Sequence, residues 1–307
     1  MPGTLYETRT ENISDDFDGD DGFIQGCAVS ADNVFATSGN PSYIAKFDRV
    51  DLSFISENGG VVDSPMSGSD AVPNNSENKL QTSYYHDGTV YGFCRAPEIH
   101  EINPDTLDYT GTSHYEVVPE SEWVDNPDVF EGITRYDGSA FGTAKWFVNL
   151  KGAENGDDRA VYRLDENFNH EETYIVNDNN PVVEGLYHGP DGISVFDIHG
   201  RTILVGSVTS REPEHEDAYP GLTVFEYDNL NDEFDYLGLA RVYDNPFLTP
   251  DEGFQVVETD EVFAALRYPK DFDDTREPNI LESNWNSILA HATVGDATLG
   301  DVTFGGV

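Results

Sequence analysis

The sequence predicts an all-β protein, a single five-bladed β-propeller with four antiparallel strands in each blade. A tight turn that leads into a strand recurs five times, and a segment of alternating apolar and polar residues follows four of these turns. No helical pattern of comparable length is present. Four-stranded sheets repeated around an axis leave only short, protected edges, and five units of about 57 residues fill nearly all of the 307-residue chain.

Each predicted unit opens with a short apolar strand that a polar residue introduces. These polar residues are Gln25, Gln81, Glu131, Asp191 and Glu252. The second strand follows the tight turn, and its apolar positions Phe35, Tyr91, Phe141, Leu204 and Phe263 are spaced by 56, 50, 63 and 59 residues. The third strand covers residues 44–48, 99–103, 161–165 and 224–228, with a degenerate copy at 288–292. Alternation with a period of two indicates strands that bury one face.

The repeats define one domain. We expect blades at residues 22–76, 77–125, 126–181, 182–248 and 249–307, after an N-terminal segment at residues 1–21. Each unit also leaves room for a fourth strand.

The first unit resembles a known group of propellers. Its order is Gly22-Phe23-Ile24-Gln25-Gly26, then Asp32-Asn33-Val34-Phe35, then Ile44-Ala45-Lys46-Phe47-Asp48. This order is similar to the blades of helveticin-J-like and phage tail receptor-binding propellers. The resemblance implies a module that binds cell-surface glycans.

The charge of the chain excludes some partners and suggests a habitat. There are 59 acidic and 16 basic residues, which gives a formal net charge of -43. Nucleic acid is excluded as a partner because binding to a polyanion depends on Lys and Arg. Like charges on one surface repel each other, and molar salt, with a Debye length of about 3 Å, removes most of that repulsion. The composition resembles that of haloarchaeal proteins.

The cysteine count, the first residues and the lack of a long apolar run bear on where the protein is found. Cys27 and Cys94 are the only cysteines, so no disulfide framework is expected. The first residues lack the pattern of a secretory signal peptide, and no apolar run reaches the roughly 20 residues of a membrane span, so we expect no membrane insertion.

With the phage-like blades, these features predict a non-enzymatic binding module on the virion surface of a haloarchaeal virus, in its tail or capsid. Its predicted partners are a host-surface glycan or glycoprotein and other virion proteins. An interaction scaffold in the cytoplasm of a halophilic archaeon is an alternative.

The long connections between strands indicate one functional face. Residues 57–79, 112–130, 146–158, 208–221 and 269–285 are predicted to project from the same side of the propeller, as binding loops on a rigid scaffold do. Aromatic residues in or beside these segments suit stacking on a sugar ring. They are Trp123, Trp146, Tyr219, Tyr268 and Trp285. The alternative is that they cap the blade edges beneath the loops.

Four cations form a second set of candidates. Arg95, Lys145 and Arg267 occupy matching positions four residues after the aromatic residue of the second strand, and Arg211 lies slightly farther along its unit. Such side chains can bind an acidic sugar or the carboxylate of a partner. They can equally neutralise carboxylates of their own fold.

The five polar residues that open the units are expected to ring the mouth of the central channel. Their oxygens can hold a polar ligand or a structural Ca²⁺ or Mg²⁺ ion, or they can bond neighbouring inner strands.

A glycoside hydrolase is the enzymatic alternative, with Glu131, Asp191 and Glu252 as candidates for the two carboxylates that glycoside hydrolysis requires. Asp16, Asp18 and Asp20 superficially resemble a calcium loop but lack its glycine and glutamate. No cofactor is required by these patterns.

Overall fold

A computed structural model describes most of the chain. The described residues are 9–12, 24–39, 42–59, 80–94, 96–124, 129–151, 160–176, 192–198, 200–208, 221–241, 249–258, 261–268, 277–283, 292–294 and 297–298.

The described chain is built from antiparallel sheets, as predicted. The first sheet has β2 (Gly26–Val29), β3 (Asn33–Gly39), β4 (Ser42–Asp48) and β5 (Phe54–Gly59). The second has β6 (Leu80–His86), β7 (Thr89–Cys94), β8 (Ile99–Ile102) and β9 (Tyr109–His114). The third has β10 (Val129–Tyr136), β11 (Lys145–Lys151), β12 (Ala160–Leu164) and β13 (His170–Ile175).

The two remaining sheets use segments that are distant in sequence. One contains β14 (Ile193–Ile198), β15 (Arg201–Val208), β16 (Gly221–Asp228) and β17 (Glu233–Arg241), and β21 (Ala292–Val294) and β22 (Ala297–Thr298) extend its outer edge. The other contains β18 (Thr249–Glu258), β19 (Glu261–Tyr268) and β20 (Glu277–Ser283), with β1 (Arg9–Asn12) paired to β20. A short 3-10 helix, η2, spans Glu120–Glu122.

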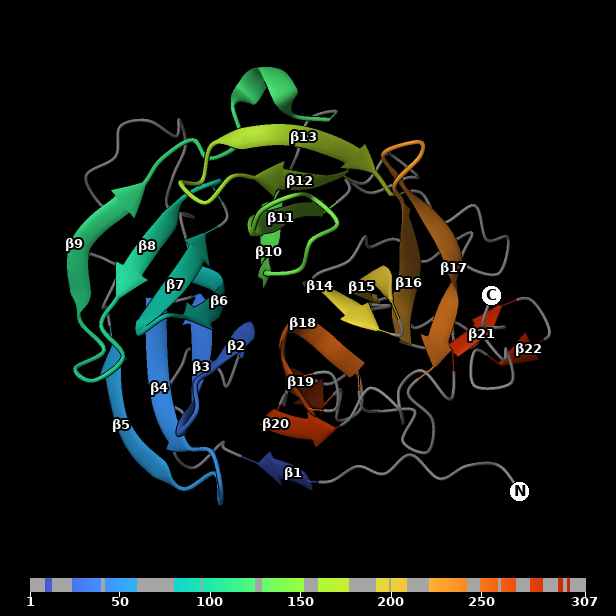
Figure 1. The fold of residues 1–307 in the computed structure, drawn as a ribbon. Coiled ribbons are helices and arrows are strands. Elements are labelled where there is room, and N and C mark those ends of the chain that lie inside the picture. The colour runs from blue at the N-terminus through green and yellow to red at the C-terminus, as the bar shows by residue number, and fades with distance from the viewer. Residues whose placement is uncertain are drawn as a thin grey trace.

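The sheets are arranged radially, which makes the fold a β-propeller. Figure 1 shows β2, β6, β10, β14 and β18 nearest the centre, with β5, β9, β13 and β17 toward the rim. Each inner strand contacts the next, and β18 contacts β2 to close the ring. The inner ends of the strands therefore surround a common axis.

The prediction of five equal four-stranded blades is wrong. The described structure has four regular four-stranded blades, not five, because the sheet that contains β14 has six strands. Two of these six, β21 and β22, come from the segment that was predicted to complete the final blade. That blade takes its outermost strand from β1 instead, and its third strand is β20 rather than the degenerate copy at residues 288–292.

The hydrophobic core lies between neighbouring sheets. One cluster joins Phe35 and Ile44 of the first sheet to Leu80, Val90 and Ile102 of the second. A second joins Phe93 and Ile99 to residues of β10, β11 and β12, and a third joins Phe147 and Val161 to the β14 sheet. Alternating strand residues thus bury apolar side chains against the adjacent blade.

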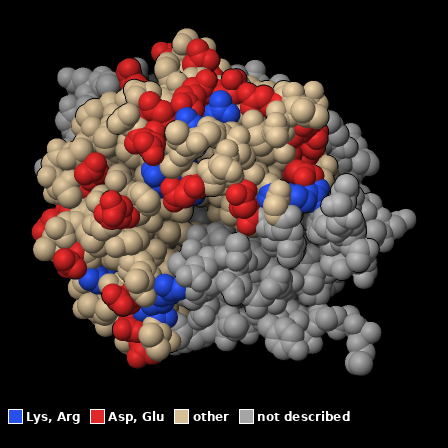
Figure 2. All heavy atoms as spheres, viewed as in Figure 1, with Lys and Arg blue, Asp and Glu red and all other residues tan. Residues whose placement is uncertain are grey.

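Acidic side chains are spread over the described surface, with few basic ones among them (Figure 2). Within the described residues, no helix has the length and apolar character needed to span a membrane.

Candidate functional site

Three inner strands, β6, β10 and β18, have an irregular pairing register near the end where each strand begins. In β6 the pairing register shifts across Gln81, and in β10 it shifts across Glu131. The shift in β18 spans Glu252, whereas Gln25 immediately precedes β2 and its N–H donates to the Thr37 carbonyl at 2.8 Å. A bulge places two residues opposite one and changes the direction of a side chain. Four of the five predicted mouth residues therefore occupy equivalent backbone positions.

Three of these side chains are buried where the inner strands meet. Gln25 is 4% exposed, Gln81 2% and Glu131 5%. The Gln25 Nε2 atom donates a hydrogen bond to Gln81 Oε1 at 2.8 Å, which joins the first two sheets. Glu131 holds the corresponding position on β10, which contacts β6, and a buried carboxylate is a group that can hold a polar ligand or transfer a proton. We call Gln25, Gln81 and Glu131 the polar ring.

Glycines allow the inner strands to approach closely beside the polar ring. A Cβ added at Gly26 would meet the Oγ1 atom of Thr82 and lie 2.7 Å from its Cα. A Cβ at Gly132 would meet Asn149 Oδ1 and lie 3.0 Å from the backbone N of Ile193. Only a residue without a side chain fits where backbones come this close.

The opposite end of the inner strands is bridged by Gln255. Its Oε1 accepts hydrogen bonds from the N–H groups of Val29 (2.9 Å) and Tyr85 (3.1 Å). Its Nε2 donates to the carbonyl oxygens of the same two residues at 3.3 and 3.2 Å. One amide from β18 thereby ties β2 to β6 near their hairpin turns, at the end away from the polar ring.

The described aromatic candidates do not form an exposed sugar-binding plate. Trp146 is 1% exposed, and its ring packs against Tyr84, Tyr91 and Phe168, with the Arg135 guanidinium 5.2 Å from the ring centre. The expectation that Trp146 lies in a long connection is wrong because it belongs to β11. Trp123 is half-buried, and its Nε1 donates to the Val118 carbonyl at 3.0 Å.

Lys145 is not equivalent to Arg95, and this prediction is also wrong. The tight-turn pattern at residues 137–142 placed the second strand too early, since β11 starts at Lys145 and pairs that residue with Tyr136. Phe147 pairs with Thr134 of the inner strand, as Phe35 pairs with Ala28 in the first sheet, so Phe147 is the residue equivalent to Phe35. Phe141 lies in the turn before β11. The Lys145 Nζ contacts Glu171 Oε1 at 2.6 Å, so this cation neutralises a carboxylate of its own fold.

Several candidates cannot be placed from the described side chains. Arg95, Asp191, Arg211, Tyr219, Trp285, Asp16, Asp18 and Asp20 lie outside the described residues, and Glu252, Arg267 and Tyr268 are described only as members of their strands.

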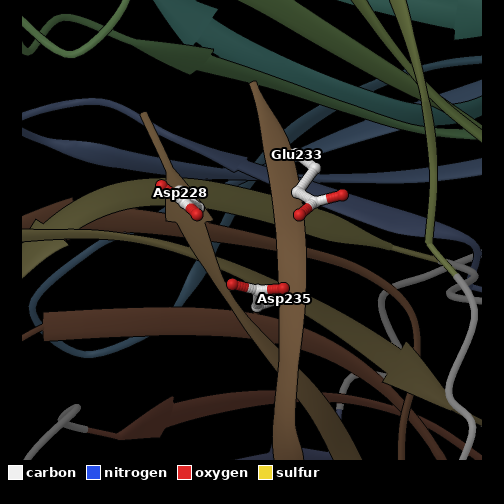
Figure 3. Close-up of side chains that lie close together, drawn as sticks. All are labelled: Asp228, Glu233 and Asp235. Atoms are coloured by element: carbon white, nitrogen blue, oxygen red, sulfur yellow. The ribbon is translucent and has the colours of Figure 1, made fainter. Parts of the chain in front are cut away.

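An acidic cluster lies on the hairpin that joins β16 and β17. The carboxylate oxygens of Asp228, Glu233 and Asp235 lie within 4.8 Å of one another (Figure 3). Glu233 and Asp235 are exposed, as is common for acidic groups on this chain. This cluster lies at an outer hairpin, so it is separate from the polar ring.

The buried thiol of Cys94 is unsuited to act as a nucleophile. Burial raises its pKa well above the ordinary value, and the nearby Glu98 adds to this effect. A thiol must lose its proton to become a strong nucleophile, and this environment disfavours the thiolate.

Sequence patterns missed two contacts between the inner strands, one at the polar ring and one at the opposite end. Gln255 lies three residues beyond the position chosen for its unit, and no pattern in the sequence distinguishes a glutamine that bridges strands. The pairing of Gln25 with Gln81 was one of the structural alternatives for the mouth residues, but its geometry requires the positions of both strands.

No protein-family model matches the sequence, and no curated protein matches it. Similarity appears among solved structures. A GH32 β-fructofuranosidase from Bombyx mori in complex with sucrose superposes with a TM-score of 0.54 and 13% identity, over 84% of this chain and 59% of that chain. The chain therefore matches less than two thirds of that protein.

Two further structures are similar over most of both chains. An α-L-arabinofuranosidase from Lactobacillus brevis has a TM-score of 0.52 and 12% identity, over 85% of this chain and 91% of that chain. A GH43 endo-arabinanase from Bacillus licheniformis has a TM-score of 0.51 and 10% identity, over 88% and 96%. At these identities the likeness concerns the fold, which this chain shares with glycoside hydrolase propellers.

Proposed function

We propose that this protein is a carbohydrate-active propeller of the glycoside hydrolase type, with its site at the polar ring. The observation that carries the proposal is the buried Glu131 carboxylate near the start of inner strand β10, at the position that the buried amide of Gln81 holds on β6. Asp191 and Glu252 hold the corresponding positions in two other sequence units. Glycoside hydrolysis needs two carboxylates, one that donates a proton to the leaving oxygen and one that attacks or activates water.

The substrate class we propose is a neutral furanoside. The similar structures include a β-fructofuranosidase bound to sucrose and an α-L-arabinofuranosidase, and both names describe enzymes of five-membered sugar rings. A net charge of -43 repels anionic sugars, which favours neutral ones. Glu131 supplies one carboxylate of the pair, and Asp191 or Glu252 supplies the other.

The test is sugar release from sucrose, arabinan and a chromogenic α-L-arabinofuranoside in molar KCl. Wild type should release sugar from at least one of them. Glu131→Gln, which removes a proton-transfer group without changing size, should lower kcat by roughly a hundredfold or more. Either Asp191→Asn or Glu252→Gln, whichever removes the second carboxylate of the pair, should cause a similar loss. Glu120→Gln, on the exposed helix η2, is the matched control and should keep full activity. Absence of release by wild type from all three substrates would disprove the hydrolase proposal.

Glycan binding without cleavage is the second candidate. It is favoured by Gln25 and Gln81, because two of the five equivalent positions carry amides that cannot serve as acid, base or nucleophile. The predicted attachment of a virion to a host-surface glycan would use the same ring. Binding of a sugar by wild type, with no release of product, is the result expected for this function.

A further inference from the structure

The Gln25–Gln81 pair has hydrogen-bonding capacity left over. After Gln25 Nε2 donates to Gln81 Oε1, the Gln25 Oε1 and Gln81 Nε2 atoms have no hydrogen-bond partner in the described part of the chain, although both are buried. Rotating both amides by 180° exchanges the roles and again leaves one acceptor and one donor unused. The pair therefore always presents one donor and one acceptor.

Leaving these atoms unpaired is costly. A buried polar group without a partner destabilises a fold, because it loses its hydrogen bonds to water and gains none in return. Unsatisfied groups of this kind in a native structure therefore indicate a partner such as a ligand or an ordered water. Apolar side chains would avoid this cost, since Gln25 and Gln81 are only 4% and 2% exposed and contribute little to solubility.

The position of the pair distinguishes its two amides from that of Gln255. Both amides lie at the starting ends of inner strands, at the position that Glu131 occupies on β10. At the other end of the same strands, Gln255 bonds the backbone of Val29 and Tyr85 on both its oxygen and its nitrogen. The Gln255 amide therefore has both its oxygen and its nitrogen engaged, whereas the amide pair at the polar-ring end has atoms left for a ligand.

We propose that Gln25 and Gln81 form a subsite for a hydroxyl group of a neutral sugar, next to Glu131. A hydroxyl both donates and accepts a hydrogen bond, which matches the unused acceptor and donor of the pair. An uncharged amide pair offers no charge to an acidic sugar, so the subsite selects neutral ligands. The identity of the sugar class rests on the function proposed above, whereas the role of the two amides is tested by binding alone.

Calorimetric titration in molar KCl, with sucrose and methyl α-L-arabinofuranoside as probes, tests this subsite. Wild type should bind at least one probe. Gln25→Met and Gln81→Met keep the side-chain length and remove the amide, so each should weaken binding about tenfold by the loss of one hydrogen bond. Gln81→Glu keeps the shape of the side chain and replaces the amide donor by an acceptor, so it should weaken binding similarly. This variant replaces the methionine variants in the test if they do not fold.

Gln255→Met is the matched control. It removes an equally buried amide from the opposite end of the inner strands, so it should lower the melting temperature and leave sugar affinity unchanged. The subsite is disproved if wild type binds neither probe, if the amide variants bind as tightly as wild type, or if a crystal structure with sugar shows only water at the two amides.

The outcome also separates this inference from the hydrolase proposal. Amide-dependent binding without sugar release supports the subsite and contradicts hydrolysis. Sugar release whose KM is unchanged by Gln25→Met and Gln81→Met supports hydrolysis and contradicts the subsite.

Discussion

Asp232 links the outer parts of two neighbouring sheets. Its Oδ1 accepts hydrogen bonds from the hydroxyl groups of Tyr174 on β13 and Tyr227 on β16, both at 2.8 Å. Arg163 of β12 approaches the same atom at 3.5 Å. Desolvation alone would raise the pKa of Asp232, but the two tyrosines and the guanidinium outweigh it and hold the pKa below the ordinary 3.8. The folded state thus favours the ionised carboxylate.

Acid should therefore remove the stabilisation that Asp232 provides. The pKa of Asp232 is lower in the folded state than in the unfolded state. Its contribution to stability is therefore complete at pH values above the unfolded-state pKa, and it is lost as the pH falls through the folded-state pKa. Asp232→Asn keeps a residue suited to the positive φ of 53° and removes the charge. At pH 7 the variant should be less stable, by less than about 1 kcal/mol because the Asp232 side chain is 47% exposed and solvent screens its charge, and below pH 3.8 the difference should shrink.

Urea unfolding of both proteins at pH 7 and at acid pH, at constant KCl concentration, measures this difference. Asp105→Asn is the control. The Asp105 side chain is 91% exposed, and its ion pair in the described part of the chain is a distant one, with Lys46 Nζ 3.9 Å from Asp105 Oδ1. A gap between wild type and Asp232→Asn that does not change with pH would contradict the role assigned to the carboxylate.

Single residues show where sequence patterns lose information. The tight-turn pattern predicted the positions of Phe35 and Tyr91 within their strands, and β3 and β7 contain them. The same pattern failed at Phe141, because residues 137–144 form a longer turn whose aromatic residue packs against Tyr227, 4.4 Å away between ring centres. Local residue type does not report how many residues a turn contains. That error placed Trp146 in a predicted connection instead of β11, and it placed Lys145 four residues after the aromatic residue of the second strand instead of at the start of that strand.

At the scale of elements, β1 is the feature that local patterns could not predict. Sequence patterns identified strands that pair with their neighbours in sequence, such as β6 to β8. The pairing of β1 with β20 joins Arg9 to Glu282 and Asn12 to Asn279, and no local signal encodes a contact across that separation. The extension of β17 by β21 escaped prediction for the same reason.

Removal of residues 1–12 should leave the edge of β20 without a partner strand. Loss of the ladder between β1 and β20 should destabilise the fold by roughly 2–4 kcal/mol, at about 1 kcal/mol for each hydrogen bond. An unpaired edge also promotes association between molecules. Thermal melts and size-exclusion chromatography should show a lower melting temperature and more aggregate for the truncated protein.

Thr10→Ala provides the comparison for this truncation. It changes a side chain of β1 and keeps the backbone groups that pair with Leu281, so its melting temperature should stay near that of wild type. Equal stability of the truncated protein and wild type would show that β1 does not contribute to the sheet.

At the scale of the whole molecule, charge should control stability. With a net charge of -43, repulsion across the compact surface is strong at low ionic strength. Salt shortens the Debye length from about 8 Å at 0.15 M to about 3 Å at 1 M, so the melting temperature should rise steadily as KCl is added up to molar concentration. Calorimetric scans over that range measure the effect.

Neutralising exposed carboxylates offers a control for salt dependence. Glu120→Gln combined with Glu122→Gln removes two negative charges from the exposed helix η2, so the double variant should be less sensitive to KCl than wild type. A melting temperature that does not change with salt would contradict the electrostatic account.

The strand that the N-terminal part of the chain lends to the last sheet also sets an order of assembly. During synthesis on the ribosome, β1 is made before β20, and it has no partner strand while the more than two hundred residues between them are added. The sheets between them can form as their strands appear, but the last sheet stays incomplete until β20 has been made. Slow translation of the segment between β1 and β20 therefore prolongs the time during which the nascent chain has unpaired strands and can associate with other molecules.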